Sequence, residues 1–105
     1  MRVLIIEPRK CPHVAEIDGS LKSMQEIVGG YIEVICPFAD KVAIVCNEEG
    51  KLKPDTEWNR LIPECGDIIK GTFFICGVDG EEFIDLSPEL IEKYANYFRS
   101  YFIPI

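Results

Sequence analysis

The apolar residues of this chain fall into short, largely β-branched runs that end at proline, glycine or charged residues. The strongest runs are residues 3–6 (VLII), 42–46 (VAIVC) and 73–76 (FFIC). Residues 3–6 are apolar at every position, which is typical of a central strand covered on both faces. All three runs are far shorter than the roughly 18–20 residues that span a bilayer. The pattern predicts a sheet-centred domain without a membrane helix.

Two segments have helical spacing. Ser20 is a candidate N-cap for the first helix. We expect this helix to end at Gly29 or Gly30, because glycine closes a helix in the left-handed conformation without a Cβ penalty. Ser87, Pro88 and Glu89 supply a cap, a proline at the first helical position and an acidic first turn. An apolar stripe follows them, formed by Leu90, Ile91, Tyr94, Tyr97, Phe98, Tyr101 and Phe102. We expect this stripe to cover the sheet.

The remaining segments complete a predicted α+β fold. Residues 31–36 and 41–46 form an expected antiparallel hairpin, and residues 82–85 are an expected short strand after residues 72–77. Residues 51–66 lack a sustained period and are expected to form an ordered loop. The sequence therefore predicts a mixed or mainly antiparallel sheet of four to five strands, with two helices packed on one face.

Length and composition limit the class of protein. The chain has 105 residues, so we expect a single domain over residues 1–105. Its net charge of −7 and the lack of a dense Lys/Arg run disfavour binding to polymeric nucleic acid. The five cysteines form no CxxC pair, which indicates a reducing compartment and no zinc site. Cys36, Cys46 and Cys76 lie within apolar segments and are expected to be small buried hydrophobes. Since the first residues are typical of a strand and not of a secretion signal, the expected location is cytoplasmic.

The candidate ligand-binding residues are polar groups near predicted turns and strand ends. They are Tyr31, Glu33, Asn47, Glu49, Asn59 and Arg60. We expect the end of the first helix, the Asn47 turn and the Asn59-Arg60 loop to converge on one hollow. There the planar guanidinium of Arg60 binds a phosphate or carboxylate, and the side-chain amides of Asn47 and Asn59 hydrogen-bond an amide or the edge of a base. The ring of Tyr31 stacks on the ligand. The alternative is local structure: Asn47 bonds its own turn and Gly50 supplies positive φ. In this alternative Asn59 caps the loop, and Arg60 pairs with Glu33 or Glu49 to pin the loop against the sheet.

Catalysis is not indicated. His13 is the single histidine and lies in a proline-containing connector, with no sign of an activated nucleophile beside it. Gly29-Gly30 ends a helix, whereas a phosphate-cradling loop begins one. We therefore predict no catalytic residues, no metal site and no cofactor, and we expect that the protein is not an enzyme.

Four separated segments carry a family resemblance. They are residues 24–33 (MQEIVGGYIE), 46–52 (CNEEGKL), 59–60 (NR) and 67–75 (DIIKGTFFI). Together they resemble a domain family of unknown function common in Firmicutes, their phages and their mobile elements. The resemblance implies a genomic context and no particular chemistry. Accessory and anti-defence proteins are frequent in that context, which is an argument by association.

Two functional hypotheses follow from these observations. The first is a non-catalytic module of a phage or mobile element that captures a small polar ligand, such as a nucleotide-like defence signal. The second is an acidic interaction domain that blocks a basic host protein, with complementary charge speeding encounter. Pairing of exposed strand edges into a homo-oligomer is compatible with both hypotheses.

Overall fold

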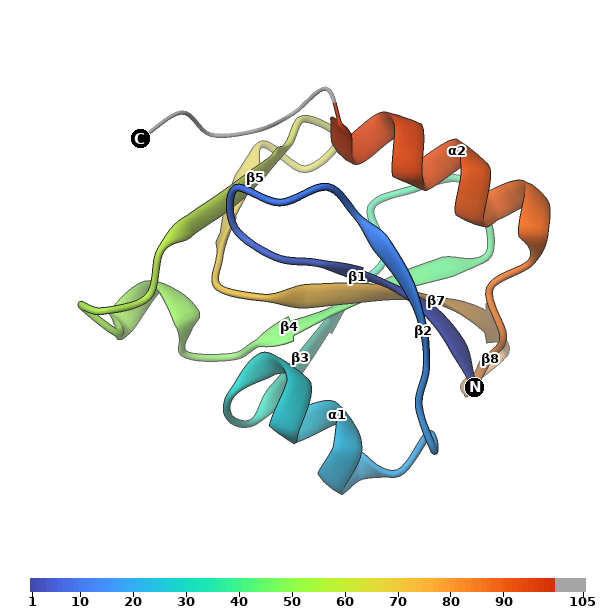
Figure 1. The fold of residues 1–105 in the computed structure, drawn as a ribbon, viewed down its shortest axis with the longest axis horizontal. Helices are drawn as coiled ribbons and strands as arrows, with labels where there is room; N and C mark the ends of the chain where they lie inside the picture. The colour runs from blue at the N-terminus through green and yellow to red at the C-terminus, as the bar shows by residue number, and fades with distance from the viewer. Residues whose placement is uncertain (100–105) are drawn as a thin grey trace.

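The computed structural model describes residues 1–99, which form two helices, a six-stranded sheet and a separate two-stranded sheet (Figure 1). In chain order the elements are β1 (Arg2–Ile6), β2 (His13–Glu16), α1 (Leu21–Val28), β3 (Ile32–Ile35), β4 (Val42–Asn47), the 3-10 helix η1 (Gly50–Leu52), β5 (Trp58–Ile62), β6 (Asp67–Lys70), β7 (Phe73–Asp79), β8 (Glu82–Ile84) and α2 (Pro88–Arg99).

The large sheet is antiparallel in every pairing. Its strand order is β2-β1-β7-β4-β3, and β8 pairs with the end of β7. The predicted α+β class with a mainly antiparallel sheet is confirmed, although the sheet has six strands where four to five were predicted. The additional strand is β2, whose residues were predicted to form a connector. β2 has no strong strand pattern of its own, and it forms because it folds back on β1 with Ile5 opposite His13 and Arg2 opposite Glu16.

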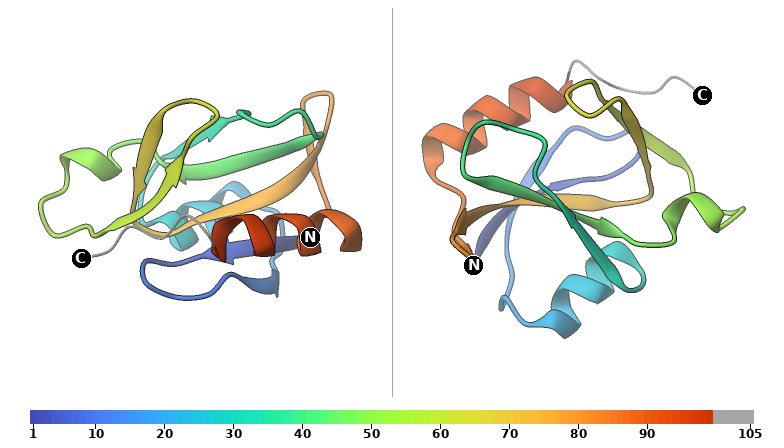
Figure 2. Two further views of the ribbon diagram at one scale, coloured as in Figure 1. Left: turned by 90° about the horizontal axis from the view of Figure 1, so that it is seen from above. Right: turned by 180° about the vertical axis from the view of Figure 1, so that it is seen from behind.

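The two helices cover opposite faces of the large sheet (Figures 1 and 2). Met24 and Val28 of α1 pack with Val3, Ala43, Val45, Phe74 and Cys76. Tyr94 and Phe98 of α2 pack with Leu4, Ile6, Val42, Ile44, Phe73 and Ile75. This arrangement differs from the prediction that both helices pack on one face. The reason is that β1, β4 and β7 are apolar at successive positions, so both faces of the sheet need to be covered.

A hairpin of β5 and β6 shares the α2 face of the sheet. Ile62 of β5 and Ile69 of β6 belong to the same buried cluster as Tyr94 and Phe98. Residues 58–62 were predicted to be part of a loop, and the structure corrects this. The register shifts between Trp58 and Arg60, and such an irregularity breaks the two-residue alternation by which a strand is read from sequence.

Both predicted helix starts are confirmed. The Ser20 Oγ accepts a hydrogen bond from the Ser23 backbone N–H at 3.1 Å, and α1 ends at Gly29 with φ of 82°. The Ser87 Oγ accepts from the Leu90 N–H at 3.3 Å at the start of α2. Tyr101 and Phe102 of the predicted aromatic stripe lie outside the described residues.

Candidate functional site

Four of the six predicted site residues gather where β3 and β4 meet η1. Tyr31 precedes β3, Glu33 lies on β3, Asn47 ends β4 and Glu49 precedes η1. They line two different hollows. Glu33 faces the α2 side of the sheet with Cys46, whereas Tyr31 and Glu49 line a hollow at the end of α1, and Asn47 lines both hollows.

Arg60 is not in either hollow. Its side chain is 0% exposed, and its Nε donates to the carbonyl oxygen of Phe98 at 2.8 Å. Its Nη2 donates to the carbonyl oxygen of Lys10 at 2.6 Å, and its Nη1 donates to Asn59 Oδ1 at 2.7 Å. Burial lowers the pKa of the guanidinium from its ordinary value. Arg60 therefore has the structural role of the alternative interpretation, but its partners here are backbone carbonyls and Asn59, not Glu33 or Glu49.

Asn59 is buried beside Arg60. Its Nδ2 donates to the carbonyl oxygens of Ile6 and Gly71, at 2.9 and 2.8 Å. The expectation that Asn59 and Arg60 converge on one hollow with Tyr31 and Asn47 is therefore wrong. The physical reason is that β5 is a strand whose Asn59 and Arg60 side chains turn into the protein, where backbone carbonyls satisfy their donors.

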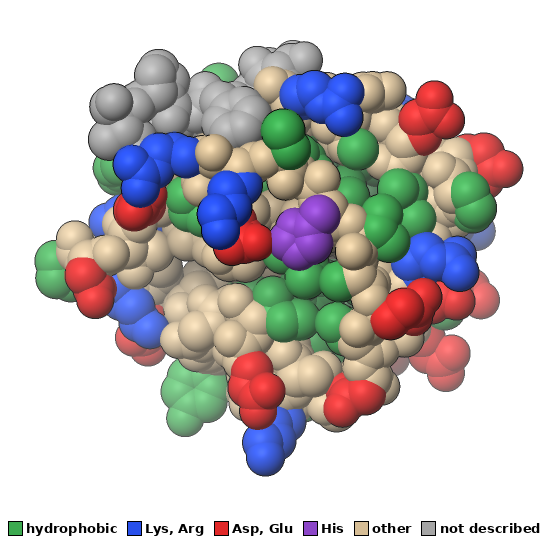
Figure 3. Space-filling model, viewed as in Figure 1, with side chains coloured by type: hydrophobic (Ala, Val, Ile, Leu, Met, Phe, Trp, Pro, Cys, Tyr) green, Lys and Arg blue, Asp and Glu red, His purple; other side chains and the backbone are tan. Residues whose placement is uncertain are grey.

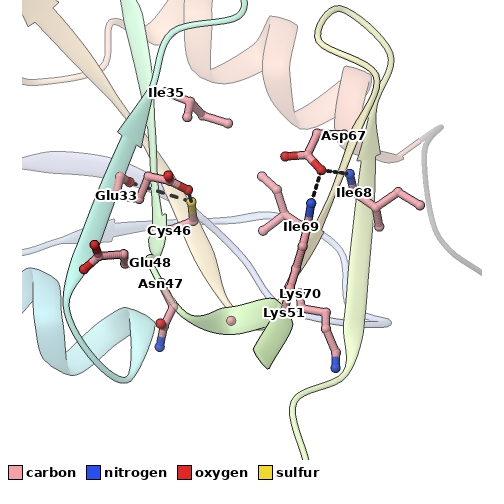
Figure 4. A pocket seen from close by; sticks show the side chains of 11 residues that line it. Glu33, Ile35, Cys46, Asn47, Glu48, Lys51, Asp67, Ile68, Ile69 and Lys70 are labelled. Carbon is pink, nitrogen blue, oxygen red and sulfur yellow. Dashed lines mark hydrogen bonds and ion pairs between the residues drawn. The ribbon is translucent and has the colours of Figure 1, made fainter. Parts of the chain in front are cut away.

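The hollow on the α2 side lies between the end of the large sheet and the β5–β6 hairpin, and we call it the β3–hairpin hollow (Figure 4). Its volume is about 230 Å³. It is lined by Glu33, Ile35, Cys46, Asn47, Glu48, Gly50, Lys51, Asp67, Ile68, Ile69 and Lys70. Ile35 and Ile69 supply apolar surface, while charged side chains stand on both walls. This mixture of apolar surface and a few polar groups is typical of a small-molecule site.

The sheet wall of this hollow carries an acid beside a buried thiol. The Cys46 Sγ lies 3.9 Å from Glu33 Oε1 and 3.7 Å from the Glu33 carbonyl oxygen. Burial, and secondly the Glu33 carboxylate, raise the pKa of Cys46 to about 12. At neutral pH the group is therefore a neutral thiol that donates to Glu33. A thiol in this state is not an activated nucleophile.

The hairpin wall carries cations together with one acid. The Lys51 Nζ donates to Asp67 Oδ1, and this hydrogen bond is the main cause that lowers the pKa of Asp67. The Lys70 Nζ donates to the Lys53 carbonyl oxygen at 3.1 Å and lies 5.0 Å from the centre of the Trp58 ring. An ammonium has three donors, so both lysines keep donors for a further partner. Figure 4 shows Glu33 and Cys46 facing Lys51 and Asp67 across the hollow.

The second hollow is built around the end of α1. Asn47 Nδ2 donates to the Val28 carbonyl oxygen at 3.1 Å, and Asn47 Oδ1 accepts from the Glu49 N–H at 2.7 Å. The Lys53 Nζ donates to the Gly29 carbonyl oxygen at 3.0 Å. These bonds cap a helix end and close a turn. The turn interpretation of Asn47 is thereby confirmed, whereas Gly50 lacks the expected positive φ because it begins η1. The Asn47 and Lys53 side chains of this hollow already serve the fold.

The sequence alone does not place Cys46, Lys51, Asp67, Ile69 and Lys70 beside Glu33. Cys46 was interpreted as a small buried hydrophobe, and it is buried. The other four belong to η1 and β6, and no local pattern shows that the hairpin packs beside β3. Only a prediction that β5 pairs with β6 would have placed these residues near β3. The shift in register between Trp58 and Arg60 makes that pairing hard to recognise from the sequence.

Three observations concern the described residues more broadly. Neither α1 nor α2 has the length and apolar character needed to cross a membrane. Over residues 1–99 there is also no group of three or more His, Cys, Asp or Glu side chains placed to hold a metal ion. On the face shown in Figure 3, Lys and Arg side chains are interspersed with Asp and Glu side chains.

The fold and the hollows define a small α+β domain with an antiparallel sheet and a side hairpin. The chain belongs to the family described as "Domain of unknown function (DUF3846)", whose model matches residues 1–99. This match confirms the resemblance to a family of unknown function. No curated protein and no solved structure matches the chain.

Proposed function

We propose that the protein is a non-catalytic module that binds a small polar ligand in the β3–hairpin hollow. The observation that carries the proposal is the position of Glu33, whose carboxylate faces Lys51 across a hollow with Ile35 and Ile69 on its walls. A carboxylate accepts hydrogen bonds and an ammonium donates them. The hollow therefore suits a ligand that has a donor edge at one end and an anionic group at the other.

A nucleotide has this polarity. The Watson–Crick edge of guanine presents adjacent N–H donors that a carboxylate such as Glu33 accepts, in the same way that acidic side chains accept from amino groups of bases. Lysine binds phosphate as a point charge, and Lys51 and Lys70 stand on the opposite wall. At about 230 Å³ the hollow lies below the roughly 300 Å³ at which drug-sized pockets begin. The base would enter and the phosphate would stay at the mouth.

Isothermal titration with GMP, CMP, AMP and UMP tests the proposal. We expect GMP to bind most tightly, and Glu33→Gln to weaken its binding about tenfold because the amide replaces one acceptor by a donor. Glu81→Gln is the matched control, since Glu81 is an exposed glutamate in the turn between β7 and β8, outside the hollow. The absence of heat with all four nucleotides, or equal losses in both variants, would contradict the proposal.

The second candidate is a protein-interaction domain that docks on a basic partner. The observation that favours it is the edge of the sheet at β3, where exposed Glu33 lies beside exposed Val34. The net charge of −7 speeds encounter with a basic protein. Lysozyme is a basic protein, and its retention at low salt on a column that carries the immobilised domain, with release at high salt, measures this general attraction.

A further inference from the structure

The outer edge of β3 has backbone groups that no described strand pairs. β3 pairs with β4 on its inner side, with Glu33 opposite Cys46 and Val34 opposite Val45. The Glu48 N–H donates to the Tyr31 carbonyl oxygen at 2.9 Å. Since hydrogen-bonded pairs alternate along an antiparallel ladder, Glu33 and Ile35 also bond to β4. The N–H and C=O groups of Ile32 and Val34 therefore point outward.

The side chains along this edge differ between its two faces. Val34 is 42% exposed and Ile32 packs partly against the α1-side core. Glu33 points to the opposite face, into the β3–hairpin hollow. An incoming strand would thus meet an apolar row on one face and a carboxylate on the other. Period-two alternation of apolar and basic residues matches this edge.

We propose that β3 accepts an extended basic segment of a partner protein as an additional antiparallel strand, with a Lys or Arg opposite Glu33 and an apolar residue opposite Val34. The inference rests on the second candidate function, protein interaction. In such a strand the backbone groups of Ile32 and Val34 supply affinity, and the residue opposite Glu33 supplies selectivity. That residue occupies a non-hydrogen-bonded position, where side chains approach most closely.

The negative charge of the protein favours a basic segment over a second copy of this chain as the strand that pairs with β3. Each copy carries a net charge of −7, so two copies repel. Antiparallel pairing of β3 with β3 of a second copy would also bring two Glu33 carboxylates onto the same face. A basic segment reverses the sign of both interactions.

A peptide of alternating lysine and valine, acetyl-Lys-Val-Lys-Val-Lys-Val-Lys-amide, probes the edge directly. We expect hydrogen exchange followed by NMR to show new protection at the Ile32 and Val34 amides when the peptide binds. The Glu33 and Ile35 amides already bond to β4 and should change little. The same peptide with Glu in place of Lys should bind at least about tenfold more weakly at low salt.

Val34→Pro supplies the sharpest variant. It removes an outward N–H and no bond to β4, a position where an edge strand tolerates proline. We expect it to weaken binding of the Lys-Val peptide about tenfold, whereas Val34→Ala, which keeps the N–H, should weaken it less than about threefold. Circular dichroism of Val34→Pro reports on folding, and GMP titration of the same variant reports on the small-ligand site, which shares Glu33 with the edge but does not use the Val34 N–H.

Three results would overturn the edge proposal. The first is that the peptide leaves the Ile32 and Val34 amides unprotected, even if lysozyme is retained. The second is that Val34→Pro and Val34→Ala bind the peptide equally well. The third is protection of these amides that rises with protein concentration without peptide, which would assign the edge to a second copy.

Discussion

The Nε of Arg60 donates to the backbone carbonyl oxygen of Phe98 over 2.8 Å, which joins β5 to the last turn of α2. Other guanidinium nitrogens of Arg60 donate to the carbonyl oxygens of Glu7 and Lys10, in the connection between β1 and β2. One side chain thus fastens three segments that are distant in the sequence. The carbonyl groups at a helix C-terminus carry partial negative charge, so they suit a buried cation.

Replacing Arg60 by lysine should destabilise the fold. A lysine keeps the charge and loses the planar fork that reaches several carbonyls at once. We expect Arg60→Lys to lower the free energy of unfolding by about 3 kcal/mol, measured by urea denaturation. Arg99→Lys is the control, because Arg99 lies on the surface of α2, and it should change stability by less than about 0.5 kcal/mol. Equal midpoints for the two variants would contradict the fastening role.

Local sequence patterns predict part of this fold, and tertiary contacts such as those of Arg60 determine the rest. The interior strands and both helices were predictable, because their apolar periods and caps are local properties, as at Ser20 and Ser87. β2 and β5 were not predictable, because their own residues have no clear strand pattern and they form strands by pairing with β1 and β6. The polarity of Asn59 and Arg60 indicated a site, whereas their surroundings are buried carbonyls that no local pattern reveals.

Asn47 should stabilise the end of α1. Its amide donates to the Val28 carbonyl oxygen and accepts from the Glu49 N–H. Asn47→Ala removes both bonds, and we expect a loss of about 2 kcal/mol in the free energy of unfolding. Asn47→Asp keeps the acceptor and loses the donor, and its carboxylate faces helix carbonyls, so it should be no more stable than Asn47→Ala.

A double-mutant cycle with Gly30 tests the same contact. A Cβ at Gly30 would lie 2.9 Å from Asn47 Nδ2, so Gly30→Ala forces the amide to shift. We expect Gly30→Ala to cost less stability in the Asn47→Ala background than in the wild type, because the obstructing amide is then gone. Additive losses would show that the two residues do not interact.

Of the predicted site, the cluster around β3 and β4 was accessible from sequence, and the opposite wall was not. Glu33 and Asn47 stand at a strand and at a strand end, where polar residues are conspicuous. Lys51 and Asp67 come to face Glu33 only because the hairpin packs beside the sheet, with Ile62 and Ile69 in the core. That packing is a tertiary property, so the charge pair facing Glu33 could be located only in three dimensions.

Asp40 should make stability depend on pH. Its Oδ2 accepts from the Lys93 Nζ at 2.5 Å and from the Tyr94 hydroxyl at 2.8 Å. These bonds, first that of Lys93, hold the pKa of Asp40 below its ordinary 3.8. A carboxyl group whose pKa is lowered by folding stabilises the protein above its unfolded pKa and loses that contribution as the pH falls through the folded value.

The comparison of wild type with Asp40→Asn measures this dependence. Melting temperatures followed by circular dichroism should differ most between the two proteins near about pH 7, where the carboxylate is charged. The difference should narrow as the pH falls below about 4, because Asp40 is then protonated in the wild type as well. A difference that stays constant over this range would show that the Lys93 and Tyr94 contacts contribute nothing through charge.

The cysteines should divide into two reactivity classes, and the division reports on the β3–hairpin hollow. Cys11, Cys36 and Cys65 are exposed, although Cys36 was interpreted as buried from its apolar segment, whereas Cys46 and Cys76 are buried. Burial is the first cause that raises the pKa of both buried thiols to about 12. Since the thiolate is the reactive form, iodoacetamide at neutral pH should label the three exposed cysteines of the native protein much faster than Cys46 and Cys76, which should react readily only after denaturation. Mass spectrometry of peptides resolves these rates.

Glu33→Gln extends this measurement to the hollow itself. The Glu33 carboxylate is the second cause of the raised pKa of Cys46, after burial, and it does not act on Cys76. Neutralising it should therefore speed native labelling of Cys46 while the rate at Cys76 stays unchanged, so Cys76 is an internal control for global unfolding. Equal acceleration at both thiols would indicate a destabilised fold. Unchanged labelling of Cys46 would show that the Glu33 carboxylate does not set the electrostatics of the hollow.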